Sequence, residues 1–326
     1  MKKEVYNQSV CLVNEVAYLY YIKQLPVVTI ANELHVSQST VSRSIKRAKK
    51  EDIITFNMNS NALSCIQMEQ RIKEHFKLKN CFVVPSFSNT FISEDPIKVK
   101  KRVALEGARY LQRIVNDEDT IGIAWGRTMY HLIHYLNPCQ RRGSKIVTLH
   151  GSIENVNPKF NVGELAHRAA MAFGGKQYLL THRGILNEQE LSKINNSNYH
   201  EIFNQYFNAI NVSISSVGVL YPAMTTPLMS TDYLNFGEIQ ELQSKHAYCD
   251  FLLRFLDQDG KELDTSIKKR TNAITLEQYR KIPLKIVVTA GAEKVYAVRA
   301  LLKGKLIDVL ILDQFLANAL FALDSE

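Results

Sequence analysis

The chain has 326 residues, a formal net charge of +8 and a pI near 9.1, which suits an anionic partner. It is far longer than the roughly 60 residues of a lone DNA-binding module, so a second domain with its own large core is expected. No apolar run reaches the roughly eighteen residues that span a bilayer, and the start MKKEVYNQSVCLVNE is unlike a signal peptide, so we expect a cytoplasmic protein without membrane contact. The five cysteines form no Cys-x-x-Cys pair, and we expect no disulfide framework, metal or cofactor.

Residues 29–54, TIANELHVSQSTVSRSIKRAKKEDII, have the pattern of two short helices joined by a tight turn. Ser37 is placed to cap the second helix, and Ala31 is small where two helices must cross. His35 stands where the chain leaves the first helix, a position that often needs positive φ and favours glycine. Apolar residues recur at helical spacing in both halves, at Ile30, Ala31 and Leu34 and then at Val41, Ile45 and Ala48.

The second of these helices carries polar and basic side chains of the kind that contact DNA. A recognition helix presents its first turns to base edges, where Arg43 can pair with guanine and Gln38 with adenine. Lys49 and Lys50 near its end suit the phosphate backbone and the helix dipole. The alternative is a small helical bundle with a solvated basic face. The side chains that we expect to contact double-stranded operator DNA are Gln38, Ser39, Thr40, Ser42, Arg43, Lys46 and Arg47.

The chain divides into three expected parts. Residues 1–57 form the helix-turn-helix domain, with a preceding helix around residues 13–20 packed beneath it and a short strand at 53–58. Residues 58–80 form a connecting helix and a plausible oligomer contact. Residues 81–326 form the larger domain, in which short β-rich runs alternate with helical ones. Such alternation predicts a doubly wound α/β fold with a mostly parallel sheet, whose ligands bind at the carboxyl ends of the strands.

Three turns that follow predicted strands carry groups suited to ligand binding. Trp125-Gly126-Arg127-Thr128 offers free N–H groups, a hydroxyl and a guanidinium to an anion such as phosphate, although a lone glycine in such a turn is also commonplace. His150-Gly151-Ser152 is the second turn. In the third, Gly291-Ala292-Glu293-Lys294, a lysine opens a helix against its dipole, which indicates an anionic partner or merely an exposed side chain. Asp250 could accept hydrogen bonds from sugar hydroxyls, or be a solvated or structural carboxylate.

As a set, the chain resembles the SorC family of bacterial transcription regulators, also grouped with the sugar-binding DeoR-type regulators, over nearly its whole length. The resemblance implies an effector domain folded like sugar-phosphate isomerases of the glucosamine-phosphate deaminase type. It also implies homodimers or homotetramers and a sugar or polyol effector that we expect to be phosphorylated. The motifs that carry it are STVSRSIKRAKKEDII, IGIAWGRTM, VTLHGS, YCDFLLRFLDQDG, IPLKIVVTAGAEKVYAVRALLKG and IDVLILDQFLANALF.

Carried over to this sequence, the resemblance assigns a phosphate to Gly126, Arg127 and Thr128. The rest of the effector site would then be lined by His150, Gly151, Asp250, Gly291 and Lys294. Two departures bear on the choice of effector. Ser152 stands where many relatives have a second glycine, and residues 180–184 read Leu-Thr-His-Arg-Gly instead of Leu-x-Ala-Pro-Ala.

We therefore expect a DNA-binding regulator of a carbohydrate-utilisation operon, which an effector switches by preferring one of two states. A second hypothesis is a sugar-phosphate isomerase or deaminase fused to a DNA-binding head, with Asp250, Lys294 and His150 available as acid, base or Schiff-base residues. Turnover of a sugar phosphate would distinguish it. A third is an architectural DNA-binding oligomer, which predicts no pocket and no ligand-induced shift in melting.

Overall fold

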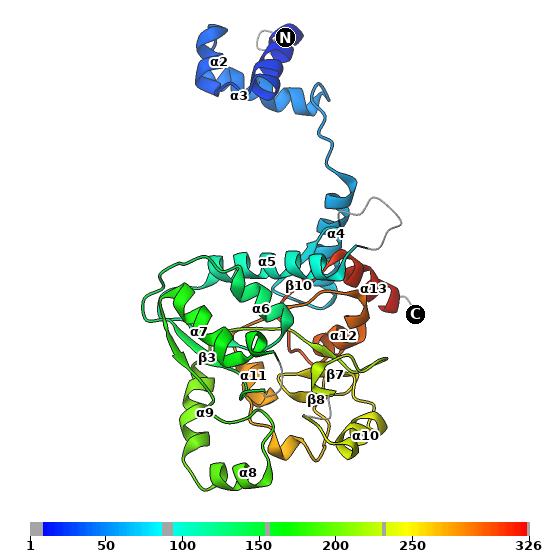
Figure 1. Cartoon of the computed structure of the whole chain (residues 1–326). Coiled ribbons are helices and arrows are strands. Elements are labelled where there is room, and N and C mark those ends of the chain that lie inside the picture. Colours follow the sequence, from blue (N-terminus) through cyan, green and yellow to red (C-terminus); the bar gives the residue numbers. More distant parts are fainter. Residues whose placement is uncertain (1–8, 87–93, 154–156, 230–232, 325–326) are drawn as a thin grey trace. The chain divides into compact units, whose positions relative to one another are not determined.

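The computed structural model describes residues 9–86, 94–153, 157–229 and 233–324. Within it the chain forms two compact units, Met1–Ser60 and Asn61–Glu326 (Figure 1). Each unit has its own apolar core, as the length of the chain predicts.

The first unit is a small helical bundle. Its elements are α1 (Val10–Ala17), which continues into the π-helix η2 (Tyr18–Ile22), then α2 (Val27–Glu33) and α3 (Gln38–Lys50). Ser37 caps α3 by accepting a hydrogen bond from the N–H of Thr40 at 3.2 Å, and His35 has a φ of 53° in the turn. Val16, Ile30 and Val41 are fully buried between the helices. The predicted pair of helices, the cap and the turn at His35 are thus confirmed.

The predicted strand at residues 53–58 is wrong. After α3 the N–H groups of Ile53 and Ile54 both bond to the carbonyl of Ala48, which closes the end of the helix. Residues 55–59 then run without regular structure. A single extended segment in an all-helical unit has no neighbouring strand with which to form backbone hydrogen bonds. Residues 53–58 therefore do not form a strand despite their β-like composition.

Helix α4 (Ser60–His75) belongs almost entirely to the second unit. Its Cys65 and Ile72 are buried in the core of that unit, together with Leu78 just beyond the helix. The expected three-part division, with a separate connecting segment at residues 58–80, therefore differs from the observed one, in which the boundary lies at Ser60. The sequence signal was ambiguous because this helix mixes polar and apolar residues on several faces.

The second unit is built on a seven-stranded sheet in which every pair is parallel, with the order β1-β10-β9-β5-β2-β3-β4. The chain adds β3 and β4 on one side of β2, then returns to β2's other side with β5 and continues through β9 and β10. The strand order thus reverses between β2 and β5. The strands are β1 (Asn80–Val84), β2 (Thr120–Ile123), β3 (Lys145–Thr148), β4 (Lys176–Tyr178), β5 (Val212–Ser215), β9 (Leu284–Val288) and β10 (Val309–Asp313).

Helices cover both faces of this sheet because its strands are apolar on both sides. Along β10, for example, Val309 and Ile311 enter one core cluster while Leu310 and Leu312 enter the other. The first cluster is completed by α5 (Pro96–Ile114), α6 (Arg127–His134) and α7 (Val162–Phe173). The second is completed by α4, α9 (Tyr199–Ala209), α11 (Leu276–Lys281), α12 (Val295–Lys303) and α13 (Gln314–Asp324). This is the doubly wound α/β fold that the alternating pattern predicts.

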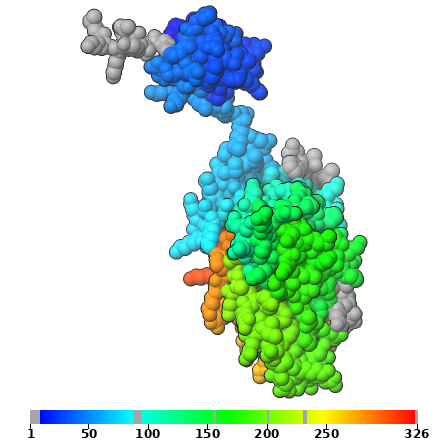
Figure 2. Space-filling view, turned by 90° about the vertical axis from the view of Figure 1, so that its left-hand side faces the viewer, coloured from blue at the N-terminus to red at the C-terminus, as the bar shows by residue number. Residues whose placement is uncertain are grey.

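Smaller elements complete the second unit. A three-stranded antiparallel sheet consists of β6 (Gly218–Val219), β7 (Cys249–Phe251) and β8 (Arg254–Leu256). Helices α8 (Glu188–Asn195) and α10 (Phe236–Ser244) lie at the lower end of Figure 1. The cyan and green segments, which include α5 to α9, make up most of the second unit's face in the space-filling view (Figure 2).

Within the described ranges, no helix combines the length and apolar character needed to cross a membrane. The same part of the chain contains no cluster of three His, Cys, Asp or Glu side chains able to hold a metal ion. All five cysteines, at positions 11, 65, 81, 139 and 249, are free thiols.

Candidate functional site

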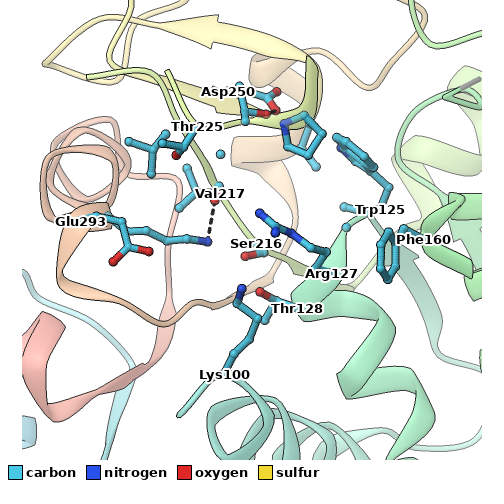
Figure 3. A pocket seen from close by; sticks show the side chains of 18 of the residues that line it. Lys100, Trp125, Arg127, Thr128, Phe160, Ser216, Val217, Thr225, Asp250 and Glu293 are labelled. Atoms are coloured by element: carbon cyan, nitrogen blue, oxygen red, sulfur yellow. Dashed lines mark hydrogen bonds between the residues drawn. The ribbon is translucent and has the colours of Figure 1, made fainter. Parts of the chain in front are cut away.

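A cavity of about 590 Å³ opens at the carboxyl ends of the strands, where the strand order reverses. The segment after β2, residues 124–128, forms one part of its wall, and the segment after β5, residues 216–219, forms another (Figure 3). In open α/β sheets this reversal leaves a crevice between connections that run to opposite faces. The position of the cavity is therefore set by the order of the strands and not by any single side chain.

Helix α6 begins at the wall of this cavity. Its N-cap, Gly126, has a φ of 122°, which only glycine adopts without strain, and no side chain caps the helix. The N–H groups of the first turn, together with the hydroxyl of the buried Thr128, lie where an anion can accept them. The exposed Arg127 extends into the cavity from the same turn (Figure 3).

Two lysines from other elements reach the same cavity. Lys100 comes from α5, and burial followed by the nearby Arg127 lowers its pKa. Lys294 comes from the turn after β9 and donates a hydrogen bond from Nζ to the carbonyl of Val217 at 3.0 Å. Burial, with Lys100 as the next cause, lowers the pKa of Lys294 to about 8. Three cations from three elements thus converge, with Glu293 and Asp250 as the carboxylates of the lining.

Asp250 lies across the cavity from Lys100 in Figure 3, on strand β7 next to Gly218 of β6. Its side chain is buried, and Oδ2 accepts a hydrogen bond from the hydroxyl of Thr226 at 3.3 Å. The other oxygen, Oδ1, is buried without a hydrogen-bond partner. Burial raises the pKa of Asp250 to about 7, so the carboxyl can either donate or accept near neutral pH.

Aromatic and small polar residues fill the space between these charged groups. Trp125 and Phe160 lie side by side at one wall (Figure 3). Phe160 ends the 3-10 turn η3 (Pro158–Phe160), and its carbonyl accepts the N–H of Gly126 at 3.4 Å. An apolar wall beside a cluster of polar groups is the usual composition of a small-molecule site.

Five of the eight predicted effector residues line this cavity: Gly126, Arg127, Thr128, Asp250 and Lys294. The structure does not bring the other three into the lining. Gly291 instead donates its N–H to Oδ2 of Asp313 at 2.6 Å. Gly151 is buried, where a Cβ would collide with the carbonyl of His182.

His150 is also absent from the lining, because its ring is completely buried behind the wall. The backbone N–H of Trp125 donates to its Nε2 at 3.1 Å, while its Nδ1 lies 2.8 Å from the carbonyl of Gly151. These partners require the neutral tautomer with the proton on Nδ1. Burial lowers the pKa of His150 to about 4. The ring therefore positions the turn that the ligand would meet.

The residues at which the sequence departs from the resembled family lie beside this buried histidine. Ser152 forms an isolated parallel bridge with Arg183, and the N–H of Ser152 donates to the carbonyl of His182. Neither Ser152, His182 nor Arg183 lines the cavity. His182 and Arg183 therefore add no positive charge to the lining of the cavity.

In the first unit, the predicted DNA-contacting residues share one face of α3. Five of the seven are exposed; Thr40 and Arg47 are half-buried. Arg43 donates from Nε to the carbonyl of Ser39 at 3.3 Å, and Arg47 pairs with Glu51 at 2.7 Å. The buried face of α3 is formed by Val41, Ser44 and Ala48.

The second unit matches a known family. The Sugar-bind family model, which describes a sugar-binding domain, matches residues 60–322. The chain belongs to this family. Among curated relatives, the sorbitol operon regulator of Klebsiella pneumoniae is 24% identical over 318 residues, covering 96% of this chain and 98% of that protein. The deoxyribonucleoside regulator of Bacillus subtilis is 28% identical over 307 residues, covering 94% and 96%.

The crystal structure of the full-length sorbitol operon regulator SorC from Klebsiella pneumoniae has the same fold. Its TM-score is 0.72 at 24% identity, and the match covers 95% of this chain and 98% of that one. The predicted family and fold class are therefore confirmed: this Sugar-bind member is a SorC-family, sugar-binding transcriptional regulator.

Several residues of the Sugar-bind cavity were missed in the sequence. Lys100 lies inside a helix and Phe160 in a 3-10 turn, and neither follows a predicted strand. Ser216 and Gly218 do follow a strand, β5, so the rule used for the other turns would have found them. The remaining members of the lining that were not singled out are Ala124, Asn157, Val217, Val219, Thr225, Thr226, Pro227 and Leu252.

Proposed function

We propose that the cavity binds a phosphorylated sugar or polyol and that this effector controls the binding of operator DNA by α3. The observation that carries the proposal is the convergence of Lys100, Arg127 and Lys294 on the uncapped start of α6. Guanidinium and ammonium groups beside free helix N–H groups match the charge and hydrogen-bond acceptors of a phosphate ester.

The opposite part of the cavity suits hydroxyl groups. Asp250 offers an unpartnered buried oxygen, and the hydroxyls of Thr225 and Thr226 belong to the same lining. A buried polar atom that lacks a partner is costly, and a ligand hydroxyl would supply one. An effector with a phosphate at one end and hydroxyls along its length would satisfy both parts of the site.

The operator contacts are assigned to the exposed face of α3, where Gln38, Ser39, Ser42 and Arg43 would read bases and Lys46 would bind phosphate. We further propose a homodimer or homotetramer, with α4 as one contact, because paired recognition helices read the two halves of a palindromic operator. The exposed Leu63 and Ile66 on α4 support this role. The work of such a regulator, control of a carbohydrate-utilisation operon, takes place in the cytoplasm.

The first test is thermal melting of the full-length protein with matched pairs of free and phosphorylated sugars and polyols. A ligand that binds only the native state raises the melting temperature by mass action. We expect shifts from phosphorylated members that are lost in Arg127→Ala. Lys145→Ala is the matched control, since Lys145 is an exposed cation at the opposite end of a neighbouring strand. Each hit is then titrated against operator DNA by fluorescence anisotropy, and a hit that leaves DNA affinity unchanged contradicts the switch.

The rival hypothesis is a sugar-phosphate isomerase or deaminase. The raised pKa of Asp250 and the lowered pKa of Lys294 are also features of acid-base sites. The relatives are named regulators, and we propose binding without turnover. Incubation of the protein with each melting hit, followed by mass analysis of the sugar phosphate, separates the two: conversion at a rate that Asp250→Asn removes would establish the enzyme.

A further inference from the structure

Two side-chain amides and the backbone of one residue form a closed ring of hydrogen bonds at the carboxyl edge of the sheet. Gln314 accepts the N–H of Ser86 on Oε1 at 2.9 Å and donates from Nε2 to Oδ1 of Asn61 at 2.6 Å. Asn61 in turn donates from Nδ2 to the carbonyl of Ser86 at 2.7 Å. Each amide uses its oxygen as acceptor and its nitrogen as donor, so the ring is satisfied in one orientation. We call Asn61, Ser86 and Gln314 the amide clasp.

The clasp joins three elements that are distant in sequence. Ser86 follows β1, Gln314 is the first residue of α13 directly after β10, and Asn61 is the second residue of α4. Asn61 is also the first residue of the second unit, immediately after the boundary at Ser60. The chain that leads to the DNA-binding unit is therefore fastened to the edge of the sheet by one side chain of α13.

One carboxylate connects this clasp to the cavity. Asp313, the residue before Gln314, accepts the N–H of Gly291 on Oδ2 at 2.6 Å. Its other oxygen, Oδ1, accepts the N–H groups of Phe315 and Leu316 at 3.0 and 3.2 Å, which caps α13. Gly291 begins the turn that carries Lys294 into the cavity. Movement of this turn would therefore act directly on the first residues of α13.

Two hydrogen bonds tie this turn to its surroundings, one from Gly291 to Asp313 and one from Lys294 to Val217. Gly291 has a φ of 107°, and a Cβ at this position would collide with the carboxylate of Glu293. The ammonium of Lys294 donates a hydrogen bond to the carbonyl of Val217. An anion in the cavity competes for that ammonium, so binding changes a hydrogen bond between the tip of the turn and the segment after β5.

We propose that the amide clasp is the element that couples occupancy of the cavity to the start of α4, with Gln314 as its positioning residue. This inference rests on the proposed function, because it needs an anion bound at Arg127 and Lys294. If the two sites are coupled, occupancy of the cavity changes a measurable property of the start of α4. Both sites are therefore followed in one experiment.

Amide hydrogen exchange of the full-length protein provides that experiment, with inorganic phosphate as the probe and sodium chloride at matched ionic strength as the blank. Exchange reports local opening segment by segment. In the wild-type protein, phosphate should slow exchange about threefold or more at residues 126–130, which report the cavity, and at residues 61–66, which report α4. In Gln314→Ala it should protect residues 126–130 only.

Two further variants make the result specific. Asn318→Ala, which alters an exposed residue one turn along the same helix, should behave like the wild type at both segments. Asn61→Ala, which removes the other partner of the 2.6 Å bond, should reproduce Gln314→Ala. Retained protection at residues 126–130 shows that each variant is folded.

The outcomes separate this inference from the proposed function. Protection of the cavity without protection of α4 in the wild type overturns the clasp and leaves the anion site standing, as does protection of both segments in Gln314→Ala. If phosphate protects neither segment in the wild type, the proposed anion site fails and the coupling fails with it.

Discussion

The imidazole of His150 and the backbone of Trp125 form a hydrogen bond of 3.1 Å behind the wall of the cavity. The N–H of Trp125 donates to Nε2 of this completely buried, neutral ring, whose Nδ1 lies 2.8 Å from the carbonyl of Gly151. Trp125 precedes the glycine at which α6 begins. His150, which follows β3, therefore holds the turn after β2 in place. This turn is where we propose that the anion binds.

Replacing His150 should cost stability and weaken ligand binding indirectly. His150→Ala leaves a void and an unsatisfied buried N–H at Trp125, a loss of about 2–4 kcal/mol in the free energy of unfolding. His150→Gln retains an acceptor and should lose less. Denaturant unfolding measures both, and equal losses in the two variants would show that the hydrogen bond to Trp125 does not matter.

Because of the same histidine, the stability of the folded protein should fall as the solution becomes acidic. The pKa of His150 is lowered from 6.5 to about 4 by burial, so the unfolded chain binds the proton more readily than the folded protein does. The stability contribution is complete above about pH 6.5 and is lost as the pH falls toward about 4. In His150→Gln this part of the acid-side decline in melting temperature should disappear, and an unchanged decline would contradict the assignment.

Lys100 should select for phosphorylated ligands. It adds a third cation to the cavity from α5, and removing it leaves the hydroxyl-binding part untouched. We expect Lys100→Ala to weaken binding of a phosphorylated hit about tenfold, corresponding to about 1.4 kcal/mol. Binding of the unphosphorylated counterpart should change less than about twofold. Calorimetric titration of both ligands makes the comparison, and equal losses for the pair would remove Lys100 from the phosphate site.

Lys294 should make anion binding weaken in mild alkali. In the free protein its pKa is lowered to about 8, chiefly by burial, whereas a bound anion favours the charged form. Ligand affinity should therefore fall as the pH rises through about 8, because binding then requires uptake of a proton. Lys294→Arg keeps its charge and should flatten the decline between about pH 7 and about pH 9. Titrations at these two pH values suffice, and a decline that persists in the arginine variant points to another group.

Asp250→Asn should stabilise the unliganded protein while weakening its ligand binding. Burial raises the pKa of this carboxyl from 3.8 to about 7, so its ionisation opposes folding progressively from about pH 4 to about pH 7 and constantly above. The gain in melting temperature from the amide should therefore be larger at about pH 8 than at about pH 5. A gain that does not depend on pH would show that the carboxyl is already ionised without cost.

We predict two kinds of DNA contact on the exposed face of α3. Arg43→Ala should lose discrimination between operator and random DNA, since a guanine contact contributes about 1–3 kcal/mol to specificity. Lys49→Ala should weaken both DNAs equally and reduce the slope of log affinity against log salt by about one. Fluorescence anisotropy at several salt concentrations measures both. Equal losses on both DNAs for Arg43→Ala would end its role in reading bases.

Structural features that depend on residues close together in the sequence could be predicted. Ser37 caps α3 because the hydroxyl and its N–H partner are three residues apart, and the turn at Gly126 follows a strand directly. Lys100 and Phe160 were not predictable, since only tertiary packing brings α5 and η3 to the cavity. His150 was identified as important but assigned to the lining, because a sequence does not show on which side of the backbone a side chain leaves the strand end.

The reversal of strand order has a practical consequence for engineering. The chain leaves the cavity after Phe160 and returns to it at Ser216, and α8 and α9 lie on the excursion between them. In this excursion residues 196–198 connect helices α8 and α9 and contribute nothing to the cavity lining. A fluorescent domain inserted there would be carried by the sensing unit without interrupting the sensor, so that this fold offers a ready attachment point for an optical metabolite reporter.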